Sequence, residues 1–175
     1  MNAMKKVLLI MWTILLFASC AKEDRNNMIV NQEEAIDRYI SQLEDVRVVR
    51  NGGASRLVYI EGEGRESLAA GDSVKFYYAG YVFSGGKGAL FATNNPEIAA
   101  NNDFPLAGGI EERVPGRGDM VKGLANGLMG ARAGEKCDVV FSAKYGYGNT
   151  AVYNVPKMTP LIFEIWVEDI VKNKT

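Results

Sequence analysis

Few residues in this sequence are able to do acid–base or nucleophilic chemistry. No histidine occurs among the 175 residues, which excludes Ser/His/Asp and Cys/His catalysis and any His-ligated metal site. The acidic residues are scattered without the spacing of a metal-binding loop, and no Gly-Lys-Ser/Thr phosphate loop is present. We therefore expect no metal and no cofactor, and a reaction that does not need an imidazole.

One of the two cysteines, Cys20, follows a segment typical of export. Two lysines precede an apolar run at residues 7–17, which is too short to span a bilayer as a mature helix. Residues 15–20, Leu-Leu-Phe-Ala-Ser-Cys, are similar to the lipobox of bacterial lipoproteins. This resemblance implies a signal peptide over residues 1–19 and a lipidated Cys20, anchored by several acyl chains. Plain secretion and an uncleaved anchor are the alternatives.

The residues after Cys20 bear on location and partners. Residues 21–24, Ala-Lys-Glu-Asp, are similar to the export signal of lipoproteins displayed by Bacteroidetes-type cells, although a solvated tether is equally consistent. The lipoprotein resemblance implies the bacterial outer membrane, at its periplasmic face or at the cell surface. The net charge of -1 provides no basic field for a phosphate backbone, so we expect no nucleic-acid partner. Cys137 lies in a strand-like run, and we interpret it as a small core residue.

The chain after the cysteine predicts a helix behind a tether. Residues 20–31 are polar enough for a flexible tether, and Asn31 is a candidate N-cap for an amphipathic helix over residues 32–48. Apolar residues recur there at helical spacing, at Ile36, Tyr39, Ile40, Leu43 and Val46. This face either packs on the folded domain or forms a homodimer.

Further along, the pattern changes to that of a sheet. Apolar and aromatic residues alternate at Leu57 and Tyr59, at Val74, Phe76 and Tyr78, and at Leu161, Phe163, Ile165 and Val167. One short helix is expected at about residues 120–128, with Asp119 as its cap. The fold class is therefore α+β, with a mostly antiparallel sheet against a short helix.

Several motifs between residues 55 and 172 occur in one order that resembles a known family. They are Gly71-Asp72-Ser73-Val74-Lys75-Phe76-Tyr77-Tyr78-Ala79-Gly80, Phe104-Pro105-Leu106, Val121-Lys122-Gly123-Leu124-Ala125-Asn126-Gly127-Leu128, Tyr145-Gly146-Tyr147-Gly148 and Val155-Pro156. The segment resembles the FKBP family of peptidyl-prolyl cis/trans isomerases. The resemblance implies a bent antiparallel β-sheet wrapped around one short α-helix, with an aromatic pocket between them and proline-containing polypeptides as substrates.

The resemblance also assigns the residues of that pocket. It implies a catalytic set made of Tyr78, Phe91, Tyr147 and Phe163. The substrate-binding positions that it implies are Phe104, Met120, Val121, Leu124 and Val155. Tyr147 is expected to donate a hydrogen bond from its hydroxyl to the bound peptide. Trp166 falls on the opposite face of its strand from Phe163, so it receives no pocket role.

The sequence departs from the family pattern at two pocket positions. Ala92 replaces the usual Asp of active members, and Leu124 stands where many members have Trp. The loop Gly108–Gly118 is longer than usual, and either covers the rim of the pocket or is a tolerated surface loop. The main hypothesis is an isomerase that acts on exported proteins at the cell envelope. The alternatives are a catalytically weak or inactive peptide-binding module and a structural subunit of a surface complex.

Overall fold

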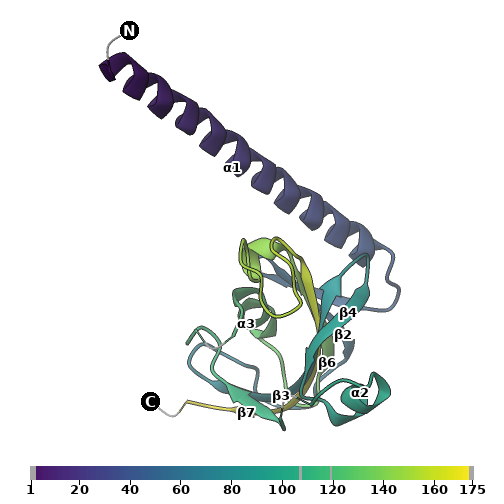
Figure 1. Cartoon of the computed structure of the whole chain (residues 1–175). Helices are drawn as coiled ribbons and strands as arrows, with labels where there is room; N and C mark the ends of the chain where they lie inside the picture. Colours follow the sequence, from purple (N-terminus) through teal and green to yellow (C-terminus); the bar gives the residue numbers. More distant parts are fainter. Residues whose placement is uncertain (1–2, 107, 119, 174–175) are drawn as a thin grey trace.

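The computed structural model describes residues 3–106, 108–118 and 120–173, with side chains from residue 22 onward. Its elements are α1 (Ala3–Ser41), β1 (Arg47–Asn51), β2 (Ala54–Ile60), β3 (Ser73–Phe83), β4 (Lys87–Thr93), α2 (Pro96–Asn101), β5 (Glu111–Arg113), α3 (Lys122–Leu128), β6 (Lys136–Phe141), a 3-10 turn η1 (Ala143–Tyr145) and β7 (Leu161–Val171). The predicted class is confirmed, because a bent antiparallel sheet wraps the short helix α3 and is preceded by an N-terminal helix (Figure 1).

The sheet has the order β1-β2-β6-β7-β3-β4, and every pairing is antiparallel. β5 pairs with the first part of β3, while β4 pairs with its second part, so both lie along the same edge of that long strand. The register shifts within the β3–β7 pairing and twice within the β3–β4 pairing. Such irregularities bend a strand and increase its twist, which lets the sheet curve around α3.

The two faces of the sheet bury different clusters. Neighbouring residues of β7 alternate, so that Phe163 joins the cluster beneath α3 whereas Ile162 joins the cluster beneath α1. On the second face, Ile36 and Ile40 of α1 are buried against the sheet. The amphipathic face predicted for this helix is therefore occupied within the chain, which is the packing alternative and not the homodimer alternative.

The helix has other bounds than those predicted for the tether and the amphipathic helix. α1 is continuous through the predicted tether at residues 20–31, so Asn31 lies inside a helix and is not its cap. At the other end the helix stops at Ser41 instead of residue 48, and β1 follows. The β-branched residues at positions 46–49 favour a strand. Gly52 and Gly53, both at positive φ, then form the two-residue turn that joins β1 to β2.

Two further differences concern the short helices. The sequence did not predict α2, although Asn95 caps it by accepting hydrogen bonds from the N–H groups of Glu97 and Ile98, and Pro96 opens it. α3 begins at Lys122, two residues later than expected, and Val121 is its N-cap residue. The predicted cap, Asp119, lies outside the described residues.

The predicted signal peptide and the predicted lipidation site, Cys20, lie outside the residues whose side chains are described. Among the described residues, no helix combines the length and apolar character required to cross a membrane. Cys137 is fully buried, as expected for a core residue, and burial raises the pKa of its thiol.

Candidate functional site

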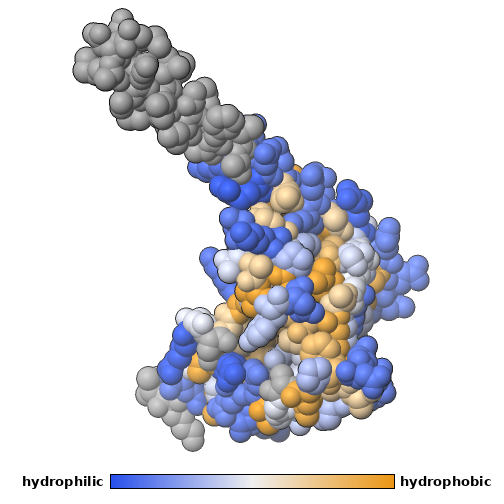
Figure 2. Space-filling view, in the orientation of Figure 1, coloured by the Kyte–Doolittle hydropathy of each residue, from blue (hydrophilic) through white to orange (hydrophobic). Residues whose placement is uncertain are grey.

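A cavity of about 420 Å³ opens between the bent sheet and the start of α3. Its lining combines aromatic, aliphatic and charged side chains from four strands, α3 and two loops: Phe76, Tyr78, Phe91, Ala92, Glu111, Arg113, Gly118, Met120, Val121, Leu124, Tyr147, Tyr153 and Phe163. Hydrophobic residues gather on the face of the domain below α1, whereas the described part of α1 is mostly hydrophilic (Figure 2). The cavity has the size and the mixed lining of a small-ligand or peptide site.

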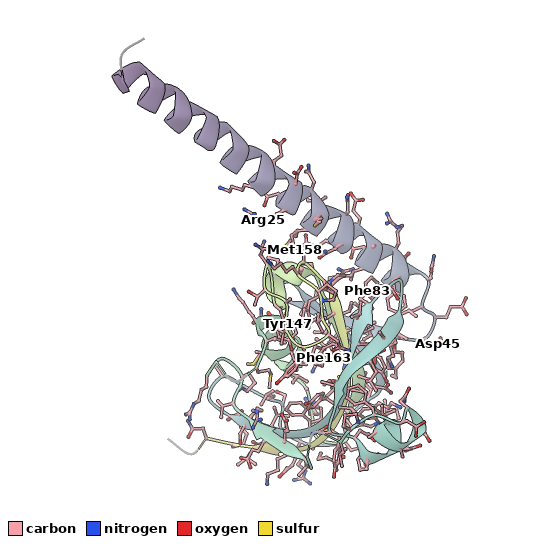
Figure 3. The ribbon with its side chains drawn as sticks, viewed as in Figure 1. Arg25, Asp45, Phe83, Tyr147, Met158 and Phe163 are labelled. Carbon is pink, nitrogen blue, oxygen red and sulfur yellow. The ribbon has the colours of Figure 1, made fainter. Side chains whose placement is uncertain are left out.

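Four aromatic side chains, Tyr78, Phe91, Tyr147 and Phe163, form what we call the aromatic wall. The Phe91 ring meets the Phe163 ring edge to face, with centroids 5.6 Å apart and planes at 90°. The ring centroids of Phe91 and Tyr147 are 6.4 Å apart, and those of Phe163 and Tyr78 are 6.3 Å apart. Tyr147 and Phe163 line the same cavity and are labelled near each other in Figure 3. Edge-to-face ring pairs are favourable contacts, so the rings of the wall stabilise one another.

The bottom of the cavity depends on how closely α3 approaches the sheet. A Cβ atom on Gly123 would lie 2.2 Å from the Phe141 ring, and one on Gly127 would lie 2.2 Å from a Val139 methyl group. Only glycine fits at these two positions. The spacing of the two glycines in the sequence motif is thus explained by packing, which carries Leu124 into the cavity.

Of the three tyrosines that line this cavity, Tyr78 and Tyr147 are half-buried and offer phenol hydroxyls as hydrogen-bond donors. Burial raises the pKa of Tyr78 to about 12 and also raises the pKa of Tyr147. Both hydroxyls are therefore protonated near neutral pH and able to donate to a carbonyl oxygen. This is consistent with the donor role expected for Tyr147.

The long loop Gly108–Gly118 contributes to the rim. β5 lies within it and pairs with β3, so that Glu111 and Arg113 project toward the cavity. Their side chains form an ion pair at 3.3 Å. Glu111 lines the same cavity as Tyr78, and after burial its charge is the next cause of the raised pKa of that phenol. The loop therefore contributes charged side chains to the lining of the cavity. The electrostatics of the cavity thus do not depend on position 92 alone.

Seven of the nine predicted pocket residues line the cavity: Tyr78, Phe91, Met120, Val121, Leu124, Tyr147 and Phe163. Phe104 does not, because the strand beside β3 is built from Glu111–Arg113, and Phe104 follows α2 with its N–H donating to the Ala99 carbonyl oxygen. Val155 is buried in the core, outside the cavity lining. It closes a bridge with Val152 that shapes the loop carrying Tyr153.

Sequence reasoning missed several lining residues. Glu111 and Arg113 alternate on a strand of three residues, which is too short to show a period. Tyr153 is 95% exposed at the rim and has a positive φ of 51°. Its exposure and backbone conformation are visible only in the structure, so no sequence pattern marked this residue.

A second cavity, of about 370 Å³, lies between α1 and the β1–β2 hairpin. Its charged residues have hydrogen-bond partners, since Arg50 donates to Asp37 at 2.7 Å and Glu33 accepts from the Ser142 hydroxyl at 3.2 Å. This arrangement fastens α1 to the domain, and the aromatic cavity is the better candidate for chemistry.

The aromatic cavity suits rotation about an amide bond. That rotation breaks amide resonance and costs about 18–20 kcal/mol in water. The twisted amide is less charge-separated than the planar one, so an apolar wall disfavours the planar form more than the twisted one. Phenol donors hold the flanking peptide at the same time. No acid, base or metal is needed for this reaction.

Comparison with known proteins agrees with this geometry. Residues 64–168 match the model of a family described as FKBP-type peptidyl-prolyl cis-trans isomerase. FK506-binding protein 1 of Aspergillus oryzae is 31% identical over 122 residues, which cover 65% of this chain and 94% of the relative.

Solved structures share the fold. The three FKBP domains of wheat FKBP73 align with a TM-score of 0.62 and 21% identity over 73% of this chain, which spans about half, 52%, of that chain. FkpA from Escherichia coli aligns with a TM-score of 0.59 and 16% identity, covering 98% of this chain and 74% of that one.

Proposed function

Because this chain belongs to the FKBP-type peptidyl-prolyl cis-trans isomerase family, we propose that its cavity isomerises prolyl bonds in exported polypeptides. The observation that carries the proposal is the aromatic wall, with the Phe91 and Phe163 rings edge to face at 5.6 Å and the Tyr147 phenol beside them. A proline ring fits an apolar cavity of about 420 Å³, and the protonated phenols can hold the adjoining carbonyl groups.

The substrates would be unfolded or partly folded chains. Uncatalysed prolyl isomerisation takes tens to hundreds of seconds and limits the folding of many proteins. An enzyme held at the membrane would meet such chains as they arrive there.

A refolding assay tests this proposal. The full chain, kept in mild detergent because of its apolar N-terminal run, is added to a protein whose slow refolding phase is limited by a prolyl bond. We expect the slow phase to accelerate with wild type and to accelerate much less with Phe91→Leu, which removes a ring of the wall. An unchanged slow phase with folded wild type would refute the catalytic role.

A peptide-binding module is the second candidate, and Ala92 favours it. Ala92 lines the cavity at the position where active members usually have a carboxylate. Binding without catalysis would appear as retention of the unfolded substrate on the protein while its refolding rate stays at background.

We propose further that Cys20 is lipidated and holds the protein at a bacterial outer membrane, at its periplasmic face or at the cell surface. The lysines before the apolar run and the residues leading to Cys20 support this. The test is fractionation of cells that express wild type or Cys20→Ala. The variant should leave the detergent-extracted membrane fraction for the soluble fraction, and unchanged membrane association would refute lipid anchoring at Cys20.

A further inference from the structure

The segment that carries Tyr147 is held by a closed ring of hydrogen bonds, which we call the Gln32 ring. The Ala143 N–H donates to Gln32 Oε1 at 2.9 Å, and Gln32 Nε2 donates to the Met158 carbonyl oxygen at 2.7 Å. The Met158 N–H donates to the Gly148 carbonyl oxygen at 2.7 Å, and the Gly148 N–H donates to the Ala143 carbonyl oxygen at 3.0 Å. One side chain of α1 therefore closes a circuit through three backbone positions.

Tyr147 lies inside this circuit. It is flanked by Gly146 and Gly148, and the N–H groups of both glycines donate to the Ala143 carbonyl oxygen. The adjoining loop contains non-glycine residues at positive φ, namely Tyr153 and Met158. Backbone in this conformation persists only where the surroundings hold it. Met158 lies directly beneath α1, next to the Tyr147 segment (Figure 3).

The partners of Gln32 are far from it in sequence, and one of them, Ala143, is buried. Ala143 is fully buried, and its N–H has the Gln32 amide oxygen as its acceptor, so removal of that amide takes away the bond that protects it. The neighbouring Glu33 accepts a hydrogen bond from buried Ser142 at 3.2 Å, which fixes the same turn a second time. The apolar face of α1 packs elsewhere, on Leu57, Val140 and Ile162.

We propose that Gln32 is a positioning residue for Tyr147, so that α1 is part of the peptide-binding machinery and not only a connection to the membrane. The proposal rests on the proposed function of the aromatic cavity. Gln32 does not line that cavity, and it acts by holding both ends of the segment that presents the Tyr147 phenol to the peptide. Both functions of the side-chain amide are used, one as donor and one as acceptor.

Two substitutions separate the two bonds. Gln32→Ala removes both, whereas Gln32→Glu keeps the acceptor for the Ala143 N–H and sets a carboxylate against the Met158 carbonyl oxygen. In amide hydrogen exchange on the full chain in mild detergent, we expect Gln32→Ala to speed exchange at the Ala143 amide, which loses its acceptor, and at the Met158 amide, which keeps the Gly148 carbonyl as acceptor but is no longer held through its own carbonyl group. Gln32→Glu should expose only the amide of Met158. Protection of both amides in both variants would overturn the ring.

Two control variants distinguish an effect of Gln32 on the position of Tyr147 from a general loosening of α1 on the domain. Gln42→Ala changes the same residue type just after α1, where the side chain is exposed. Ile40→Ala weakens the apolar packing of α1 without touching the ring. We expect Gln32→Ala to lower kcat/KM for a proline peptide about three- to tenfold. Gln42→Ala should have no effect, and Ile40→Ala should lower Tm while keeping kcat/KM within twofold of wild type.

A spectroscopic signal completes the test. With ¹³C-labelled tyrosine rings, the Tyr147 resonance, assigned by its loss in Tyr147→Phe, should shift or broaden in Gln32→Ala and stay unchanged in Ile40→Ala. If wild type lacks isomerase activity, the proposed function is refuted. Amide exchange and the Tyr147 resonance then still test whether Gln32 holds the Tyr147 segment. If wild type is active but Gln32→Ala leaves both kcat/KM and the Tyr147 resonance unchanged, the positioning role is refuted.

Discussion

Gly80 of β3 lies directly behind the Phe91 and Phe163 rings, and a Cβ atom there would be 2.8 Å from a ring atom of each. The two rings that form the centre of the aromatic wall therefore depend on the absence of a side chain at Gly80. β3 pairs with β4 on one side and β7 on the other at this residue, so its backbone has no room to move away.

Gly80→Ala should consequently disturb the cavity. The added methyl group overpacks the site, and we expect the free energy of unfolding to fall by about 1–3 kcal/mol, with a clear loss of isomerase activity as the rings turn. Thermal unfolding and a prolyl isomerisation assay measure the two effects. Gly109→Ala is the matched control, since a Cβ atom there meets nothing within 4 Å. A fully active Gly80→Ala protein would show that ring positions do not matter.

Phe163→Leu tests the wall from its other side. Phe163 contacts Phe91 and Tyr78, and it stacks on Phe141 with a centroid distance of 5.9 Å. We expect the free energy of unfolding to fall by about 1–3 kcal/mol and activity to fall about tenfold, measured well below Tm. Phe83→Leu provides a comparison, because Phe83 is equally buried but packs against α1 on the opposite face. Equal losses of activity in both variants would mean that Phe163→Leu lowers activity only by destabilising the fold.

Ala92→Asp tests the residue in which this chain departs from the family pattern. Ala92 lines the cavity and is half-buried, so a carboxylate there would face the bound peptide. We expect kcat/KM for a proline peptide to rise about two- to fivefold, equivalent to about 0.5–1 kcal/mol. Unchanged or lower activity would indicate that the Glu111–Arg113 pair already sets the electrostatics of the wall.

Asp72 predicts how stability depends on pH. Hydrogen bonds from Lys172 and from the N–H groups of Asn173 and Ala69 lower the pKa of Asp72 from 3.8 to about 2. A carboxyl group whose pKa is lower in the folded state stabilises the fold above its unfolded pKa and loses that contribution as the pH falls. Tm should therefore drop between about pH 4 and pH 2.

The matched pair for this prediction is Asp72→Asn and Asp169→Asn, because Asp169 is exposed. Asp72→Asn should lower Tm at neutral pH and flatten its fall below pH 4, whereas Asp169→Asn should follow wild type. Parallel curves of Tm against pH for all three proteins would mean that protonation of Asp72 does not affect the stability of the fold.

The sequence predicted the parts of the fold that have a long period or a strong motif. Alternation marked β3 and β7 correctly, and the motif around Gly123 and Gly127 located α3 because close packing restricts both positions to glycine. The strand β5 has only three residues, which is too short for an alternation of apolar and polar residues to show. Glu111 and Arg113 of β5 line the cavity beside β3 and Phe104 does not, which sequence order alone could not reveal.

The limits of the sequence are clearest at α1. Its apolar face was predicted from spacing, but its end was not, since the β-branched residues that follow can extend a helical pattern or begin a strand. The Gln32 ring joins residues 126 and 111 positions apart in the chain. No local pattern encodes contacts at that separation, so only the folded arrangement reveals them.

The central claim is that the aromatic cavity catalyses prolyl isomerisation with Tyr147 as a donor. The most direct measurement is the cis–trans exchange rate of a proline peptide in the presence of the full chain, wild type or Tyr147→Phe. Wild type should accelerate exchange well above background, and loss of one hydrogen bond, about 0.5–1.5 kcal/mol, should slow it about two- to tenfold. Exchange at background with wild type, while the peptide resonances shift on binding, would contradict the claim and leave a peptide-binding module.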